Sequence, residues 1–319
     1  MVSVIIPTYK RSEFIERAIE SVLNQTYKDF EIIVVDDNNP NTNYREELER
    51  KMEKYKGNSK IKYIQHEKNK NGAAARNTGI NIAKGDYITF LDDDDVFLSN
   101  RLEMLVDKLE KNQEYDAAYS SVIIIKGRKI IGYTSAKRSG NMKNELLLGN
   151  FSLGTGSNLF FRANALKAIN GFDESFKRHQ DIEVMVRYFN RYNIIAVADP
   201  LVIKVEDDRS NEPDVDKYIK VKEHFIKTFK KEIDELGNLK NIFYKNQYMM
   251  ILILAIKNKD KENARKLKDK IKKYSNFTIK EKLKLFLYKI NNYIPLQKVK
   301  YNSISYNTNK LIDDNVKSE

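Results

Sequence analysis

Residues 87–97 read YITFLDDDDVF, an apolar strand pattern that runs directly into four consecutive aspartates, Asp92, Asp93, Asp94 and Asp95. Four adjacent carboxylates repel one another, so their place on a tight turn calls for a nearby cation. Hard divalent ions prefer oxygen ligands, and Mg²⁺ takes one or two protein carboxylates while substrate phosphates complete its shell. The pattern therefore indicates a metal-bound diphosphate, with a solvated acidic loop or a structural ion site as the alternative.

The sequence around this stretch alternates between strand and helix patterns. Runs typical of buried strands occur at residues 2–6, 30–35, 61–65 and 87–91, and helical patterns occur at residues 12–24, 43–55 and 72–84. This order predicts an α/β fold, a doubly wound sheet with helices on both faces. Ligands of such sheets bind beyond the carboxyl ends of the strands, so the polar residues after Ile6, Val35 and Leu91 are expected to line one crevice. We expect Ser12 to cap the first helix and Gly85 to close the third.

Charge is distributed unevenly along the 319 residues, whose net charge is +12. Residues 217–319 hold 25 basic and 11 acidic side chains, a net +14, and residues 1–216 have a net charge of −2. We predict a nearly neutral domain over residues 1–215, a basic helical domain over 216–300 and a disordered tail over 301–319. The basic charge indicates either a solvated helical surface or a surface for an anionic membrane. Its spread without a recognisable motif predicts no nucleic-acid binding.

The chain contains no cysteine, which excludes disulfides and suits a reducing compartment. Its first residues, MVSVIIPTYKR, form a strand pattern without the basic and long apolar segments of a signal peptide. The longest apolar run, residues 248–256, is well short of the roughly 20 residues needed to cross a bilayer. We therefore expect a cytoplasmic protein that can lie on the inner face of the cell membrane.

Seven motifs occur together in one order and spacing: VSVIIPTYKR (2–11), VVDDNN (34–39), NGAAARNTGI (71–80), YITFLDDDD (87–95), GSNLFFR (156–162), NGFDE (170–174) and HQDIEVMVRY (179–188). Over about residues 1–210 the chain resembles glycosyltransferase family 2. The resemblance implies the GT-A fold, a Rossmann-like mixed sheet with a nucleotide-binding half (1–98) and an acceptor-binding half (99–215), here followed by a C-terminal helical extension. It also implies an inverting transfer from a nucleotide-sugar, expected to be a UDP-sugar, to a hydroxyl of a glycan or lipid-linked acceptor. Bacterial surface polysaccharide or teichoic acid synthesis is the expected pathway.

The resemblance also assigns nucleotide contacts, which are Pro7, Thr8, Tyr9, Arg11, Asp37, Arg76, Asp92 and Asp93. Tyr9 is expected near the base, and Asp37 is expected to accept a hydrogen bond from the pyrimidine ring. A strand-end turn is the alternative role for Asp37, and a salt bridge on the helix surface is the alternative for Arg76.

The DDDD stretch aligns with the family's DSDD, which makes Asp92 and Asp94 a D-x-D pair. Asp94 is then expected to bind Mn²⁺ or Mg²⁺ directly, with Asp92 near it through water. Asp95 is expected to hydrogen-bond within its own turn. A third metal ligand in the family follows the last strand, and residues 205–210, VEDDRS, supply acids there.

Asp181, in the first turn of the helix within HQDIEVMVRY, is implied to be the general base that takes a proton from the acceptor hydroxyl. The alternative is stabilisation of the helix N-terminus by an acid, worth about 0.3–1 kcal/mol. Gln180 stands where the family usually has Glu, and its role would be orientation. The predicted acceptor contacts are Gly154, Gly156, Ser157 and His179, with a plain tight turn as the alternative for the glycines.

Two other functions stay open at this point: a sugar nucleotidyltransferase and, less favoured, a basic nucleic-acid-binding protein, which is argued from the +14 charge of residues 217–319 but lacks a recognisable binding motif. A sugar nucleotidyltransferase would also hold a metal-bound diphosphate, but it needs a glycine-rich phosphate loop after the first strand, and PTYKRS has no glycine. The basic helices are expected to contact an anionic membrane surface or to form a homodimer through their apolar faces.

Overall fold

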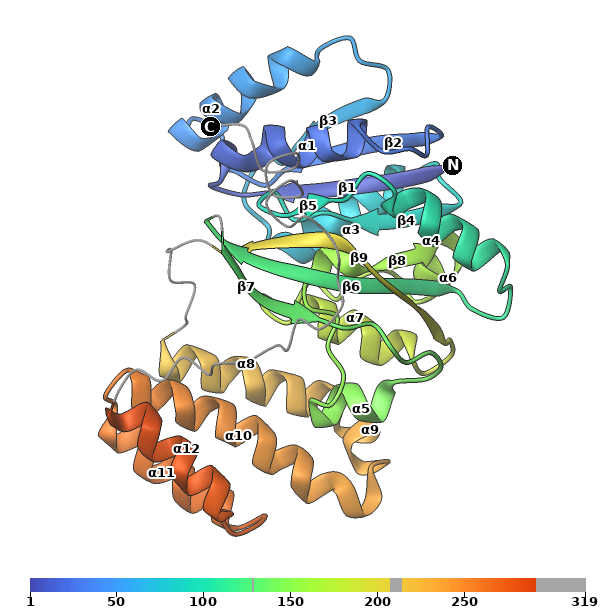
Figure 1. Ribbon diagram of the computed structural model, residues 1–319. Coiled ribbons are helices and arrows are strands. Elements are labelled where there is room, and N and C mark those ends of the chain that lie inside the picture. The colour runs from blue at the N-terminus through green and yellow to red at the C-terminus, as the bar shows by residue number, and fades with distance from the viewer. Residues whose placement is uncertain (128, 207–213, 291–319) are drawn as a thin grey trace. The chain divides into compact units, whose positions relative to one another are not determined.

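The computed structural model describes residues 1–127, 129–206 and 214–290 (Figure 1). These residues divide into two compact units. The sheet unit comprises residues 1–143 and 152–206, and the helical unit comprises residues 144–151 and 214–290. Residues 144–151, which the sequence analysis placed in the acceptor-binding half, thus belong to the helical unit. The predicted tail over 301–319 lies outside the described residues.

In the described part of the chain the strands form one mixed sheet with the order β3-β2-β1-β4-β8-β6-β9-β5, and β7 pairs with β6 (Figure 1). Strands β1, β2, β3 and β4 are parallel to one another, and β8 pairs with β4 in the antiparallel direction. The strands are β1 (Val2–Thr8), β2 (Phe30–Asp36), β3 (Ile61–Gln65), β4 (Tyr87–Phe90), β5 (Val96–Phe97), β6 (Ala117–Lys126), β7 (Lys129–Thr134), β8 (Phe160–Arg162) and β9 (Ile194–Glu206). The predicted α/β mixed sheet is confirmed.

Helices cover both faces of the parallel strands because alternate strand residues point to opposite faces. Val4 and Ile6 of β1 pack in one core with α1, α2 and α4, while Ile5 faces α3, where a Cβ on Gly79 would lie 2.4 Å from its side chain. The sheet unit's helices and 3-10 turns are η1 (Ser12–Phe14), α1 (Ile15–Leu23), α2 (Asn43–Met52), η2 (Glu53–Tyr55), α3 (Gly72–Ile82), α4 (Arg101–Glu110), η3 (Gly156–Asn158), α6 (Ala163–Ala168) and α7 (Gln180–Tyr188). After its first residue, α5 (Lys143–Leu148) belongs to the helical unit.

Two predicted helix ends differ from the structure. Ser12 does not cap α1: its hydroxyl donates to Glu47 at 2.7 Å, and a 3-10 turn precedes the helix. The α3 helix ends at a cap on Ala83, before Gly85. A Cβ on Gly85 would lie 2.6 Å from the backbone nitrogen of Ser3, so this glycine allows close packing against β1.

The helical unit is built from α8 (Val215–Thr228), α9 (Lys230–Asp234), η4 (Gly237–Leu239), α10 (Lys240–Lys257), α11 (Lys261–Lys272) and α12 (Ile279–Ile290). Leu252 of α10 and Ile271 of α11 are fully buried in its core. Residues 144–151 join this unit, where Asn246 donates from its amide to the carbonyl of Leu148 at 2.9 Å. Over the described residues, each helix is too short or too polar to cross a membrane.

Candidate active site

The carboxyl ends of β1, β2 and β4 lie side by side, as the parallel order requires. Thr8 is the register partner of Asp36, and two further backbone hydrogen bonds continue the pairing into the loops, from Asp37 to Thr8 at 3.0 Å and from Leu91 to Ile5 at 3.0 Å. The loop after β1, the acidic pair after β2 and the acidic turn after β4 are therefore neighbours. This is the arrangement that the strand pattern predicted.

The four aspartates of the acidic turn (residues 92–95) alternate between partly exposed and buried. The backbone N–H of Asp95 closes the turn on the carbonyl of Asp92 at 3.0 Å. The side chains of Asp92 and Asp94 are 32% and 19% exposed, whereas Asp93 and Asp95 are buried. Burial and then the charge of Asp94 raise the pKa of Asp93 well above its usual value. Asp92 and Asp94 are thus the members of the turn that can meet a ligand.

Asp95 holds distant segments together. Its carboxylate accepts hydrogen bonds from the hydroxyls of Thr155 at 2.7 Å and Ser157 at 2.6 Å, and from the backbone N–H of Val205 at 3.2 Å. Burial, with the charges of Asp92 and Asp94, raises the pKa of Asp95 to about 7. Asp95 thus bonds within its own turn through its backbone N–H, and its side chain binds residues outside the turn.

The predicted acceptor residues occupy different surroundings. Ser157 is fully buried, and its hydroxyl accepts from the Asp92 backbone N–H at 2.9 Å, so it stabilises the acidic turn where an acceptor contact was expected. A Cβ on Gly156 would lie 3.7 Å from Oδ2 of Asp92, which places this glycine beside the turn. Gly154 has a φ of +84° and packs against Thr134, a conformation and a closeness that favour glycine.

Two arginines pair with the partly exposed aspartates. Nη1 of Arg11, from the loop after β1, forms an ion pair with Asp94. Nη2 of Arg76, from the second turn of α3, forms an ion pair with Asp92 at 2.5 Å. Arg17 adds a hydrogen bond to the carbonyl of Asp94 at 2.8 Å. Positive charge therefore stands at both carboxylates, which offsets the repulsion that the sequence implies.

Arg76 also connects the acidic turn to the start of α7. Its Nη1 donates to the side-chain oxygen of Gln180 at 2.8 Å, and Asp181 follows directly in the first helical turn. Burial raises the pKa of Asp181, the positive charge of Arg76 lowers it and the negative charge of Asp92 raises it. His179 precedes Gln180 in the left-handed conformation, with a φ of 58°.

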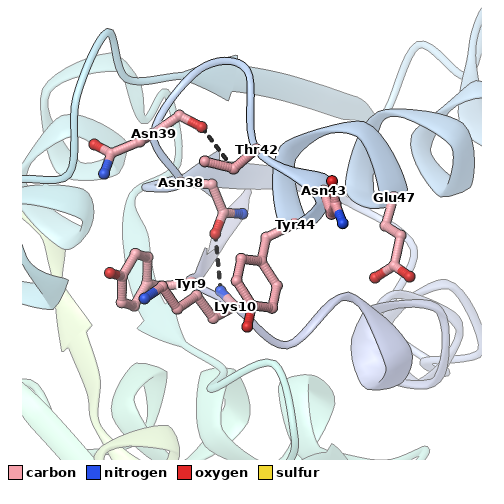
Figure 2. Close-up of a pocket in the computed structure, with 8 residues that line it drawn as sticks. All are labelled: Tyr9, Lys10, Asn38, Asn39, Thr42, Asn43, Tyr44 and Glu47. Carbon is pink, nitrogen blue, oxygen red and sulfur yellow. Dashed lines mark hydrogen bonds between the residues drawn. The ribbon is translucent and has the colours of Figure 1, made fainter.

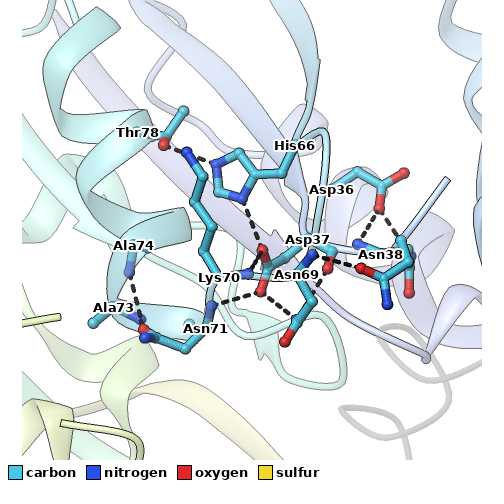
Figure 3. A network of polar contacts seen from close by, with 12 residues as sticks. Asp36, Asp37, Asn38, His66, Asn69, Lys70, Asn71, Ala73, Ala74 and Thr78 are labelled. Atoms are coloured by element: carbon cyan, nitrogen blue, oxygen red, sulfur yellow. Dashed lines mark hydrogen bonds and ion pairs between the residues drawn. The ribbon is translucent and has the colours of Figure 1, made fainter. Parts of the chain in front are cut away.

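Asp37 is the centre of a polar network that includes a histidine missed by the sequence analysis (Figure 3). Its carboxylate accepts from Nδ1 of His66 at 2.7 Å, from the amide of Asn69 at 2.7 Å and from the backbone N–H groups of Lys70 at 2.8 Å and Asn71 at 3.0 Å. Four hydrogen bonds match the acceptor capacity of a carboxylate. A bond from Asp37 to a pyrimidine therefore requires one of these donors to move.

A pocket of about 440 Å³ lies between the loop after β1 and the start of α2 (Figure 2). Tyr9 is the sequence-predicted residue that lines it, and the Nζ of Lys10 lies 5.0 Å from the Tyr9 ring and 5.5 Å from the Tyr44 ring. The backbone N–H of Lys10 donates to the Asn38 side chain at 2.9 Å. The remaining lining residues are Asn39, Thr42, Asn43 and Glu47. The asparagines after VVDD were the signal that could have identified this pocket.

The side chains that could bind the implied metal ion are those of Asp92 and Asp94. Asp92 and Asp94 supply oxygen ligands two residues apart, which suits an Mg²⁺ or Mn²⁺ ion that shares its shell with phosphates. Within the described residues no cluster of three His, Cys, Asp or Glu side chains could hold a metal by itself. Asp207 and Asp208, from the segment expected to supply a third ligand, lie outside the described residues. The two aspartates therefore fit an ion completed by a bound diphosphate.

Comparison with known proteins supports the resemblance. The model of the family described as Glycosyl transferase family 2 matches residues 3–169. The amylovoran biosynthesis glycosyltransferase AmsB of Erwinia amylovora is 32% identical over 206 residues, which cover 62% of this chain and 67% of AmsB. The UDP-Glc:alpha-D-GlcNAc-diphosphoundecaprenol beta-1,3-glucosyltransferase WfgD of Escherichia coli is 31% identical over 197 residues, which cover 62% of this chain and 73% of WfgD.

The fold also matches a solved structure. The crystal structure of S. aureus TarS 1-349 in complex with UDP-GlcNAc aligns with a TM-score of 0.57 and 17% identity, covering 87% of this chain and 93% of that one. At this identity the likeness concerns the fold alone. It confirms the expected GT-A architecture.

Proposed function

The chain belongs to glycosyl transferase family 2, and on that premise we propose that it transfers a sugar from a UDP-sugar to a hydroxyl of a lipid-linked or glycan acceptor. WfgD is named as an enzyme that uses UDP-Glc and an acceptor on diphosphoundecaprenol, and TarS was crystallised with UDP-GlcNAc. These relatives support a UDP-sugar donor and an acceptor used in bacterial polysaccharide assembly. Inversion at the anomeric carbon follows from the family.

One observation carries the proposal: Arg76 joins a donor-side carboxylate to the helix that presents Asp181. The ion pair to Asp92 is 2.5 Å and the hydrogen bond to Gln180 is 2.8 Å. An inverting transfer needs positive charge that binds the donor diphosphate and a base that takes the acceptor proton. Both must lie beside the one sugar that is transferred. The two Arg76 contacts connect the acidic turn to the first turn of the helix that carries Asp181.

Donor binding is assigned to the arginines and the pocket lined by Tyr9. Arg11 and Arg76 bring positive charge to carboxylates that would otherwise repel a diphosphate. The exposed Tyr9 ring offers a face on which a base can stack. Asp37 would act indirectly, since its network fixes Asn71, the residue that caps α3 and so orients Arg76.

Asp181 is proposed as the base. The acceptor oxygen forms a bond to the anomeric carbon while the bond from that carbon to the phosphate oxygen breaks. The hydroxyl proton passes to a carboxylate oxygen of Asp181, and UDP leaves. A carboxyl group whose pKa is raised by burial is a stronger base than an exposed one, which suits this role.

Mn²⁺ or Mg²⁺ is proposed as the cofactor, held by Asp94 and Asp92. When bound, such an ion supplies Lewis-acid stabilisation of the leaving diphosphate. We expect EDTA to abolish transfer and excess Mn²⁺ to restore it. Transfer at an unchanged rate in EDTA would remove the metal from the proposal and leave Arg11 and Arg76 as the cations.

The helical unit is proposed to hold the protein at the inner face of the membrane, where a lipid-linked acceptor lies. Ile279, Leu283 and Phe286 of α12 are 86%, 57% and 56% exposed, and their spacing places them on one helix face. Exposed Lys282 and Lys284 lie between them. An apolar stripe accompanied by lysines suits an anionic lipid surface, because the apolar side chains can enter the membrane interface while the lysines contact the lipid headgroups. Vesicles with phosphatidylglycerol should sediment the protein at low salt, whereas a concentration-dependent dimer without vesicle binding would assign the stripe to self-association.

The donor is tested by thermal shift with a panel of nucleotide-sugars in the presence of Mn²⁺. A true donor binds the folded state only and should raise the melting temperature, with UDP-sugars acting where GDP-sugars do not. Mass spectrometry then detects transfer of the sugar to a lipid-linked glycan, and proton NMR of the new linkage reports whether the anomeric configuration is inverted. If no nucleotide-sugar stabilises the chain and no transfer occurs, the proposal fails.

The base is tested with Asp181→Asn, which keeps the size of the side chain and removes its basicity. We expect transfer to fall by roughly 10²–10⁴-fold, the usual contribution of a general base. The dissociation constant for UDP, measured by calorimetry, should stay within about twofold because Asp181 contacts the acceptor. Full turnover by this variant would exclude Asp181 as the base.

A further inference from the structure

Gln180 uses both ends of its amide. Its Oε1 accepts from Nη1 of Arg76 at 2.8 Å, and its Nε2 donates to the carbonyl of Phe176 at 2.8 Å. A carboxylate at this position could accept from Arg76 but would have no hydrogen for the Phe176 carbonyl. The two contacts therefore match glutamine and not glutamate, the residue usual at this position in the family.

The guanidinium of Arg76 is held from several directions at once. Besides Asp92 and Gln180, Nη1 donates to the carbonyl of Gly72 at 3.2 Å, and the group lies 5.6 Å from the ring of Phe172. A Cβ on Gly72 would come within 3.0 Å of Nη1 and 3.1 Å of the Gln180 oxygen. Little room is left for the guanidinium to shift toward Gly72, so its place beside Asp92 depends on these neighbours.

We propose that Gln180 is a positioning residue for donor binding, because it fixes Arg76 against Asp92. Gln180 is neutral, so the positive charge of Arg76 remains available to Asp92 and to the donor diphosphate. The inference rests on the proposed function. A glutamate at 180 would form a second ion pair with the same guanidinium and compete with Asp92 for it. An apolar residue would leave Nη1 without this acceptor and free the side chain to move.

The effect is therefore expected in donor affinity more than in turnover. Loss of a hydrogen bond to a charged group is expected to cost roughly 10-fold or more in affinity. For Gln180→Met we expect the dissociation constant for UDP and the KM for the donor to rise about 10-fold, with kcat changed less than about threefold. For Gln180→Glu we expect a larger rise, because the added carboxylate also repels the diphosphate.

The role of Gln180 is tested on the full chain by calorimetry with UDP and by kinetics at varied donor concentration. The Gln180 variants are compared with Arg76→Met and with the double variant Arg76→Met, Gln180→Met. If Gln180 acts through Arg76, the double variant should bind UDP no more weakly than Arg76→Met alone. Additive losses, or wild-type affinity in Gln180→Met, would overturn the inference. Gln180→Glu also guards against misfolding, since an acid in the first turn of a helix is favourable there.

Gln113→Glu is the matched control. Gln113 is exposed and contacts Arg162, whose register partner is Tyr87 at the amino end of β4, away from the acidic turn. The same change of charge there should leave the donor KM unaltered. A wild-type chain that transfers no sugar from any nucleotide-sugar refutes the proposed function, whereas an active wild type with unaffected Gln180 variants refutes only this inference.

Discussion

Acidic turns follow β2 and β4, the two strands that flank β1 in the sheet, and they use their carboxylates differently. In the turn after β2, Asp36 and Asp37 are buried, and their oxygens are occupied by protein groups, Arg45 and Tyr63 for Asp36 and the His66 network for Asp37. In the turn after β4, Asp92 and Asp94 stay partly exposed, and each forms an ion pair with an arginine. The first turn builds the scaffold and the second can meet a ligand.

The difference shows why carboxylate count alone does not locate a binding site. A carboxylate with four protein donors has no acceptor capacity left, so a ligand must displace a donor and its hydrogen bond. A partly exposed carboxylate also faces solvent, so a ligand can approach it by displacing water and need not break a protein hydrogen bond. Exposure and the identity of the partner, more than acidity, therefore separate the two turns.

The largest expected effect is on the scaffold turn. Asp36 forms an ion pair with Nε of Arg45 at 2.8 Å, and both side chains are buried. Asp36→Asn leaves the Arg45 charge without its carboxylate and should lower the free energy of unfolding by about 3 kcal/mol, as measured by denaturant titration. Asp86→Asn, at an exposed carboxylate that pairs with the N-terminus, is the control and should change little. Equal stability of the two variants would mean that the β2 turn is not the scaffold described here.

The next effect is on the exposed turn and concerns activity. Asp94→Asn removes a proposed metal ligand and should reduce transfer by about 10²-fold while leaving the melting temperature nearly unchanged. Asp95→Asn, the neighbouring change, should instead lower the melting temperature, because Asp95 ties Thr155, Ser157 and Val205 to the turn. Equal loss of activity per folded molecule in the two variants would contradict the division of roles within residues 92–95.

Sequence alone predicted the fold because its signals are local. The strand runs and their order are visible within single segments, and they lead to the parallel sheet and to the meeting of its carboxyl ends. The seven motifs added the family and hence the mixed sheet beyond β4. Helix ends were less predictable: Ser12 has the right type for a cap, yet Glu47, which is 35 residues away, takes its hydroxyl.

The parts of the site that sequence could not supply depend on distant partners. Asp95 is held by residues 60 to 110 positions later, so nothing local distinguishes it from Asp94. The four donors to Asp37 come from residues 66–71, a segment with no recognisable motif before Asn71. The pairing of Arg76 with Asp92 and Gln180 is likewise visible only after folding. These contacts decide which carboxylates stay available.

The smallest expected effect concerns pH and tests whether the exposed turn acts on the proposed base. Asp181 works as a carboxylate, so kcat/KM should fall as pH drops through its pKa, which burial places above the usual value near 4. Arg76 lowers that pKa and Asp92 raises it. Arg76→Met should therefore move the acidic limb of the profile to higher pH, and Asp92→Asn should move it to lower pH. Limbs that coincide with the wild type in both variants would show that the turn and the base are electrostatically independent. Opposite shifts of the acidic limb in the two variants would show that the acidic turn and Asp181 belong to one site.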